Sequence, residues 1–340
     1  MGKPQKPALR LAEAVGGSPA APVLDIGCGP GLLAEHLPTP VIGLDPVREM
    51  LDLLPDHAPH AMPVQAEAAH LPFATGSLSG ALGANVYVHV DRPTLPTALA
   101  ELHRVLQIGA PVELQLFEGD QDLLALPGDS IGQRRFARWQ PEPLHSVIEG
   151  AGFAVERFDL SSGGEGWTAI EVSARRARTL PDIVGPGMRL LVCGLNPSVY
   201  SADVGVGFGR PGNRFWPAAL GAGLVSIDRD PRHALDHHGM GMTDLVKRAT
   251  PRADVLTSDE YQTGLERVER LCEWLRPETV CFVGLAGWRA AADRKATAGW
   301  QERTLGPSAV YVMPSTSGLN AHARLEDLTE HLAAAAMGPD

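Results

Sequence analysis

Leu190-Leu191-Val192-Cys193-Gly194-Leu195-Asn196-Pro197-Ser198 is the most informative stretch of this 340-residue chain. Its leading apolar residues predict a short buried strand, and Pro197 ends that strand in a rigid loop. The amide side chain of Asn196 therefore stands at a strand end. Further strands are expected over residues 279–284 and 309–313, and helices over residues 214–221, 258–275 and 325–335. This alternation predicts an α/β fold for the second half of the chain.

Two further motifs follow in the same half. The first is Gly209-Arg210-Pro211-Gly212-Asn213-Arg214-Phe215-Trp216, and the second is Met313-Pro314-Ser315-Thr316-Ser317-Gly318-Leu319-Asn320. Each motif alone is a weak indicator, but all three in this order resemble the mismatch-specific uracil/thymine DNA glycosylase family. The resemblance covers most of residues 188–336. It implies a uracil-DNA glycosylase fold and double-stranded DNA with a mismatched or damaged base as the substrate.

The resemblance also implies roles for single residues around an extruded base. At the position of Asn196 the family holds its nucleophilic water, which an amide can orient but not deprotonate. Phe208 stands where the family stacks an aromatic ring on the base, a contact worth about 1–3 kcal/mol. Leu195 and Ser315 complete the predicted base pocket. We expect hydrolysis that leaves an abasic site, because no lysine occupies a motif position where it could form a Schiff base.

The last motif is expected to enter the duplex. Leu319 is the predicted wedge, since an apolar side chain can replace the stacking that the flipped nucleotide gives up. The other residues assigned to DNA contact by the resemblance are Asn213, Arg214, Lys247, Arg248, Ser317, Gly318 and Asn320.

The chain departs from the family at positions that affect the chemistry. Other uracil glycosylases carry an aspartate near the asparagine, whereas this motif has none and Asp203 is a nearby candidate. Asp244 replaces a lysine in the segment Thr243-Asp244-Leu245-Val246-Lys247-Arg248, and Ser198 replaces a glycine. We therefore expect a slow enzyme. The preferred base stays open among uracil, thymine, ethenocytosine and another modified base.

The first half contains a glycine loop, Asp25-Ile26-Gly27-Cys28-Gly29-Pro30-Gly31, between an expected strand over residues 22–26 and an expected helix over residues 32–37. Such a loop alone suits NAD, FAD or S-adenosylmethionine. Asp45 ends the next expected strand, and Glu67 precedes the segment Leu71-Pro72-Phe73. Together with the glycine loop, these acids make residues 20–175 resemble class I methyltransferases. The resemblance implies a Rossmann-like fold and S-adenosylmethionine as cofactor. The implied cofactor-binding residues are Asp25, Gly27, Gly29, Gly31, Asp45 and Glu67.

The domain organisation follows from these patterns. Strands are expected over residues 41–45, 78–86, 111–117, 154–160 and 168–173, the last two as an antiparallel hairpin, and helices over residues 94–106 and 141–151. Two prolines and two glycines without periodicity mark a linker over residues 179–187. We predict two three-layer αβα domains, a Rossmann-like methyltransferase fold over residues 1–178 and a uracil-DNA glycosylase fold over residues 188–340.

Composition limits the classes of function. The net charge is −11, with 13 Lys and Arg against 21 Asp and Glu up to residue 180, and 16 against 19 after it. The acidic excess thus falls mainly in the first half, and DNA binding needs only a local basic surface. Four cysteines without paired metal-ligand spacing predict buried thiols, no metal site and a cytoplasmic protein. No apolar run is long enough for a membrane span, and the oligomeric state stays open.

Three hypotheses about the function of the whole chain are compatible with these patterns. The first is a DNA glycosylase that hydrolyses the glycosidic bond of uracil or a related pyrimidine. The second is a methyltransferase that an inactive glycosylase fold directs to nucleic acid. The third is a lesion-binding protein without catalysis.

Overall fold

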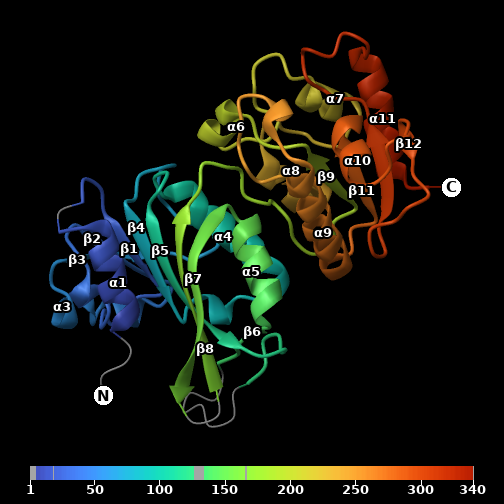
Figure 1. Ribbon diagram of the computed structural model, residues 1–340. Coiled ribbons are helices and arrows are strands. Elements are labelled where there is room, and N and C mark those ends of the chain that lie inside the picture. Colours follow the sequence, from blue (N-terminus) through green and yellow to red (C-terminus); the bar gives the residue numbers. More distant parts are fainter. Residues whose placement is uncertain (1–4, 18, 126–133, 165–166, 340) are drawn as a thin grey trace. The chain divides into compact units, whose positions relative to one another are not determined.

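A computed structural model describes residues 5–17, 19–125, 134–164 and 167–339 (Figure 1). The chain divides into two compact units, Met1–Ala177 and Arg178–Asp340. Part of the turn predicted between the last two strands of the first unit, at residues 165–166, lies outside the described residues. Within the described ranges, no helix has both the length and the apolar character that a bilayer-crossing segment needs.

The first unit is built on an eight-stranded sheet in the order β3-β2-β1-β4-β5-β8-β7, with β6 paired to β5. The first five strands of this order are parallel, while β8 runs antiparallel to both β5 and β7. The predicted antiparallel hairpin therefore lies at the sheet edge. The strands are β1 (Val23–Ile26), β2 (Val41–Asp45), β3 (Ala61–Gln65), β4 (Gly80–Ala84), β5 (Pro111–Glu118), β6 (Arg138–Trp139), β7 (Phe153–Gly164) and β8 (Trp167–Arg176).

Among the described residues, one α-helix precedes the first strand, and four α-helices and three 3₁₀ turns lie between the strands. The helix expected over residues 32–37 is only the turn η1 (Ala34–His36), because Pro38 forces Leu37 into an extended conformation. The remaining elements are α1 (Lys6–Val15), α2 (Arg48–Leu51), α3 (Leu54–His57), η2 (Tyr87–His89), η3 (Arg92–Thr94), α4 (Leu95–Val105) and α5 (Pro141–Gly150). The amphipathic α1 was not predicted, and it buries Ala8 and Leu11 in the core of this unit.

The second unit is built on a five-stranded sheet in the order β10-β9-β11-β13-β12. All pairs are parallel except β12 with β13. The strands are β9 (Leu190–Gly194), β10 (Met240–Asp244), β11 (Thr279–Val283), β12 (Gly299–Trp300) and β13 (Ala309–Met313). The helices are α6 (Val199–Val204), α7 (Phe215–Gly221), α8 (Pro231–His238), η4 (Ala253–Val255), α9 (Ser258–Leu275), α10 (Leu285–Ala291) and α11 (Leu325–Met337).

Two apolar layers cover the two faces of this second sheet. Alternate residues of the central strands point to opposite faces, so Leu191 packs with α9 and α10 while Leu190 packs with α7 and α11. Trp288 anchors the first layer and Trp216 the second, and both side chains are fully buried. The second unit is therefore a three-layer αβα domain, and both units have the predicted α/β architecture.

The segment expected to be a linker packs on the second unit. Ile183 forms an antiparallel bridge with Met242 on β10. Asp182 is buried and accepts hydrogen bonds from Lys247 Nζ at 2.8 Å and Arg267 Nη1 at 2.6 Å. A buried carboxylate is stable only with charged or hydrogen-bonding partners, and Lys247 and Arg267 of the second unit supply them. Residues 179–187 are therefore held against the second unit.

Candidate functional site

A cavity of about 250 Å³ lies at the carboxyl ends of the parallel strands of the second unit. Leu195 and Asn196 follow β9, Asp244 ends β10, Val283 ends β11 and Ser315 follows β13, and all five line it. Ligands of open parallel sheets bind at this edge. An engineered cavity of about 150 Å³ holds benzene, so this one has room for a single pyrimidine ring.

Asn196 is held in one orientation at the wall of this cavity. Its Nδ2 donates to Pro197 O at 3.2 Å, Arg248 O at 3.0 Å and Thr250 Oγ1 at 2.8 Å. Two of these partners are backbone carbonyl oxygens, which only accept, so the amide nitrogen must face them. Asn196 Oδ1 is turned away and has no hydrogen bond to a described residue. It is an acceptor that can take a hydrogen bond from water.

Phe208 presents one ring face to the cavity. Its other face stacks on Phe215, with ring centroids 4.3 Å apart and planes at 20°. The backbone of Phe208 is left-handed, with φ at 55°, a conformation that is strained for a bulky residue and tends to be retained at functional sites. Phe215 is fully buried and fixes the Phe208 ring. A planar ligand can therefore stack on an aromatic surface that is already rigid.

Asp244 brings a carboxylate into the cavity, at the end of β10. Burial raises its pKa to about 6, while the charges of Lys247 and Arg267 act in the opposite direction. Gly194 makes room for this carboxylate, since a methyl group at that position would overlap Asp244 Oδ1. The side chain has no hydrogen bond to a described residue, so it is open to a ligand or water. The sequence indicated this residue only as a substitution for the family's lysine.

The carboxylate of Asp203 lies elsewhere. Both of its oxygens accept from Arg178, through Nε and Nη2 at 2.6 Å each, and both side chains are substantially exposed. Asp203 was the sequence-based candidate for a nearby acid. The tertiary structure brings Asp244 to the cavity instead, because β10 pairs in register with β9 and places Asp244 opposite Gly194.

The Lys247 side chain is mostly buried, with 16% of its surface exposed. Its ammonium is paired with buried Asp182 at 2.8 Å, and burial lowers its pKa. Its backbone carbonyl accepts from the Thr179 hydroxyl. Lys247 is thus engaged with Asp182 of residues 179–187, and its DNA contact stays a prediction. Arg248 is exposed, but its guanidinium pairs with Glu260 at 2.6 Å.

The loop after β13 exposes Leu319, whose side chain is 88% accessible. Ser315 and Ser317 of the same loop line the cavity, as does Asn213. Asn213 Oδ1 also accepts from the Phe215 amide at 2.9 Å and so caps the start of α7. The predicted base-pocket and wedge residues are therefore close to one another in the fold.

Three of the predicted DNA-contact residues shape this loop. Arg214 Nη2 donates to Ser317 O at 3.0 Å and to Asn320 O at 2.7 Å, and Asn320 Nδ2 donates to Ser315 O at 2.9 Å. Gly318 lies against the backbone of Gly212, where a Cβ would be 2.8 Å from the Gly212 carbonyl oxygen. Both Nη atoms of Arg214 and the Nδ2 of Asn320 are thus engaged with loop carbonyls, while Arg214 Nε is buried without a partner among the described residues. The direct DNA contact of Arg214 and Asn320 stays a prediction.

The cations near the cavity mouth differ in how they are engaged. Arg252 lines the cavity and pairs with Asp254 at 2.5 Å. Arg210 also lines the cavity and is exposed, and its guanidinium has no charged or hydrogen-bonding partner among the described residues. It is therefore the guanidinium of this group that is free to meet a phosphate.

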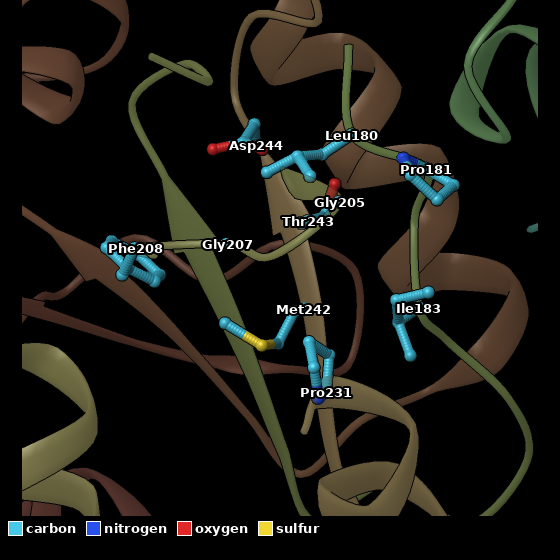
Figure 2. A pocket seen from close by; sticks show the side chains of 10 residues that line it. All are labelled: Leu180, Pro181, Ile183, Gly205, Gly207, Phe208, Pro231, Met242, Thr243 and Asp244. Atoms are coloured by element: carbon cyan, nitrogen blue, oxygen red, sulfur yellow. The ribbon is translucent and has the colours of Figure 1, made fainter. Parts of the chain in front are cut away.

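A second cavity of about 20 Å³ adjoins the first (Figure 2). Leu180, Phe208 and Asp244 line both cavities, so these three side chains form the partition between them. Met242 and Ile183 also line this second cavity. The volume is that of about one water or one methyl group. Leu180, which belongs to the predicted linker, was missed as a pocket residue because no motif marks it.

The predicted cofactor residues of the first unit share one sheet edge. Asp25 lies on β1, Asp45 ends β2 and Glu67 follows β3, and these strands are parallel neighbours. Asp45 accepts from the amides of Gly29 at 3.0 Å and Val47 at 2.9 Å, with one lone pair of each oxygen left over. Glu67 is exposed. The glycine loop is thereby tied to the strand that carries the second acid.

Glycines are required in this loop. Gly27, Gly29 and Gly31 all have positive φ, of 65°, 52° and 91°. A Cβ at Gly27 would also meet Val86, at 2.7 Å, whereas Gly29 faces open space. A ligand can therefore approach the backbone closely at Gly29.

Asp25 has properties that fit a cationic ligand. Its side chain is buried, and one carboxylate oxygen has no hydrogen-bond partner among the described residues. Burial and the charge of Asp45 raise its pKa to about 7. S-adenosylmethionine carries an ammonium and a sulfonium, so its positive charge would favour ionised Asp25. The acids and the glycine loop thus fit this cofactor.

Comparison with known proteins finds a match for each unit. Residues 23–109 match a methyltransferase domain, and residues 181–336 match the uracil DNA glycosylase superfamily. Similar solved structures include an S-adenosylmethionine-dependent methyltransferase from Methanosarcina mazei, with 18% identity, 48% of this chain and 95% of that chain covered, and a TM-score of 0.43. Another is the 1,6-didemethyltoxoflavin-N1-methyltransferase of Burkholderia thailandensis, with 23% identity, 51% and 78% covered, and a TM-score of 0.42. The chain therefore joins a methyltransferase domain to a domain of the uracil DNA glycosylase superfamily.

Proposed function

We propose that the second unit is a monofunctional DNA glycosylase that removes uracil, or a related mismatched or damaged pyrimidine, from double-stranded DNA. The observation that carries this proposal is the fixed carboxamide of Asn196, with its nitrogen held by the protein and its oxygen beside a cavity large enough for a pyrimidine. The proposal includes the cytoplasmic location expected from the sequence.

The base reaches the cavity by leaving the duplex. The target atom C1′ cannot be attacked inside a stacked helix, so the nucleotide must be extruded. Exposed Leu319 fills the gap, and Phe208, supported by Phe215, stacks on the extruded base. Arg210 at the cavity mouth meets a flanking phosphate.

Hydrolysis then needs one water. Asn196 Oδ1 accepts a hydrogen bond from that water and aims its oxygen at C1′. The bond between C1′ and the base nitrogen breaks, and its electron pair leaves with the base. The water oxygen bonds to C1′, and its proton passes to the Asp244 carboxylate, whose pKa near 6 suits a base at neutral pH. Ionised Asp244 also stabilises positive charge on the sugar.

We further propose that the first unit binds S-adenosylmethionine. Asp25 would hold the positive end of the cofactor, Asp45 and Glu67 the ribose and the adenine side, and the amides around Gly29 would face it. When bound, the cofactor supplies an electrophilic methyl group. The chain's own residues orient it, and no residue is assigned to the acceptor.

One experiment separates the possible functions. Purified full-length protein is incubated with duplexes containing G·U, G·T and ethenocytosine, and alkali-labile strand breaks are measured. We expect breaks at the target base, and a loss of several orders of magnitude for Asn196→Ala with DNA binding retained. Unchanged turnover of this variant would reject the assignment. Transfer of a labelled methyl group to DNA, with the bases left intact, would indicate a methyltransferase that the glycosylase fold directs to nucleic acid. Tight binding to the duplex without either reaction would indicate a lesion-binding protein.

A further inference from the structure

The loop that carries Leu319 is fastened to one side chain outside it. Arg214 immediately precedes α7, about a hundred residues earlier in the chain. Its guanidinium donates to the carbonyl oxygens of Ala323, Ser317 and Asn320, the last two at 3.0 and 2.7 Å. Its backbone amide donates to Thr316 O at 2.9 Å. One residue thus holds the loop at four carbonyl groups.

We propose that Arg214 is a positioning residue that holds residues 315–323 in the shape that inserts Leu319, before DNA is bound. This inference rests on the proposed glycosylase function. A loop that is already ordered loses less conformational freedom on insertion, so more of the contact energy of Leu319 is available to drive base extrusion.

Other contacts of the loop also hold it in one shape. The backbone amide of Asn320 donates to Ser317 O at 2.9 Å, and this bond closes a tight turn that contains Leu319. The Leu319 amide donates to Ser317 Oγ at 3.3 Å. Gly318 leaves no room for a side chain against Gly212. These contacts fix the backbone on both sides of Leu319, whose apolar side chain is left exposed.

Direct phosphate binding by Arg214 is the competing explanation. Both Nη atoms are already engaged with loop carbonyls, and Nε, which has no partner among the described residues, is buried out of reach of solvent. A phosphate could be reached only by breaking those bonds. The two explanations differ in their dependence on salt, since each lost phosphate contact lowers the slope of log K against log salt by about 0.9.

The test is a double-mutant cycle on a G·U duplex under single-turnover conditions. The proteins are wild type, Leu319→Ala, Arg214→Gln and the double variant, with Arg232→Gln, a surface arginine of α8 paired with Asp236, as control. We expect Arg214→Gln to lose about tenfold to a hundredfold in rate, as for lost charged hydrogen bonds. Leu319→Ala should then add little in the Arg214→Gln background, because both changes remove the same insertion. The slope of log K against log salt for DNA binding should be the same for Arg214→Gln as for wild type.

Amide hydrogen exchange tests the same inference without DNA or activity. Arg214→Gln should speed the amide exchange of residues 316–322 and leave β13 protected. Arg214→Lys should give exchange rates between those of wild type and Arg214→Gln. The single ammonium nitrogen of lysine cannot replace the two Nη atoms that donate to the three loop carbonyls. Unchanged loop exchange, additive rate losses, a smaller salt slope, or general unfolding of the second unit by Arg214→Lys would each overturn the inference. An inactive wild-type protein would instead reject the proposed function, and the exchange result would still decide whether Arg214 orders the loop.

Discussion

The carboxamide nitrogen of Asn196 lies 2.8 Å from the hydroxyl oxygen of Thr250, which in turn donates to Arg252 O at 2.9 Å. Thr250 is buried, and its hydroxyl is the one side-chain group among the described partners of this nitrogen. The hydroxyl therefore helps to decide which way the amide oxygen faces.

Replacing Thr250 with valine should slow base release without weakening DNA binding. Valine keeps the shape but removes both hydrogen bonds of the hydroxyl, the one from Asn196 and the one to Arg252 O. The bond that orients Asn196 is worth about 0.5–1.5 kcal/mol, so we expect a loss of about twofold to tenfold in kcat. Single-turnover rates on the best duplex measure this. Thr250→Ser, which keeps the hydroxyl, is the control, and equal rates for the valine and serine variants would contradict the prediction.

Activity should depend on the ionisation of Asp244. Its pKa is raised to about 6, so the carboxylate is ionised above that pH and protonated below it. We expect kcat to fall up to tenfold per pH unit below pH 6 and to level off above it. Asp244→Asn should be slow and lack this dependence. A variant that keeps the wild-type pH profile would show that another group titrates.

Asp244 should also reduce stability at neutral pH. A carboxyl whose pKa is raised on folding binds protons more tightly in the native state, so its destabilising effect is absent below the unfolded pKa near 4 and complete above about 6. Asp244→Asn should therefore raise the unfolding temperature at pH 8, and the gain should vanish towards pH 4. Thermal unfolding at both pH values tests this, and an equal gain at pH 4 would contradict it.

Gly194→Ala should act through Asp244. The added methyl group would overlap Asp244 Oδ1 and come within 3.3 Å of the Phe208 ring, so the carboxylate must move. We expect a rate loss comparable to that of Asp244→Asn, and a double variant little slower than either single one. Additive losses would show that the glycine is needed for another reason.

Binding of S-adenosylmethionine should strengthen as pH rises through 7. Asp25 has a pKa raised to about 7, and its ionised form attracts the cationic cofactor, so affinity should fall up to tenfold per pH unit below that value. Titration calorimetry between pH 5.5 and 8.5 measures this. Asp25→Asn should bind weakly at pH 8 and without pH dependence, and Glu142→Gln on α5 serves as a charge-matched control.

The sequence was enough to predict the two α/β units, the strand that leads to Asn196 and the loop that carries Leu319. Short apolar runs ended by glycine or proline allow little besides a buried strand followed by a loop, so local pattern was sufficient there. Which charged residues are available to a ligand could be learned only from the folded chain. The fold brought Asp244 rather than Asp203 to the cavity and added Leu180 to its wall. It also turned Lys247 and Arg214 inward, because strand register and long-range hydrogen bonds depend on residues far apart in the chain.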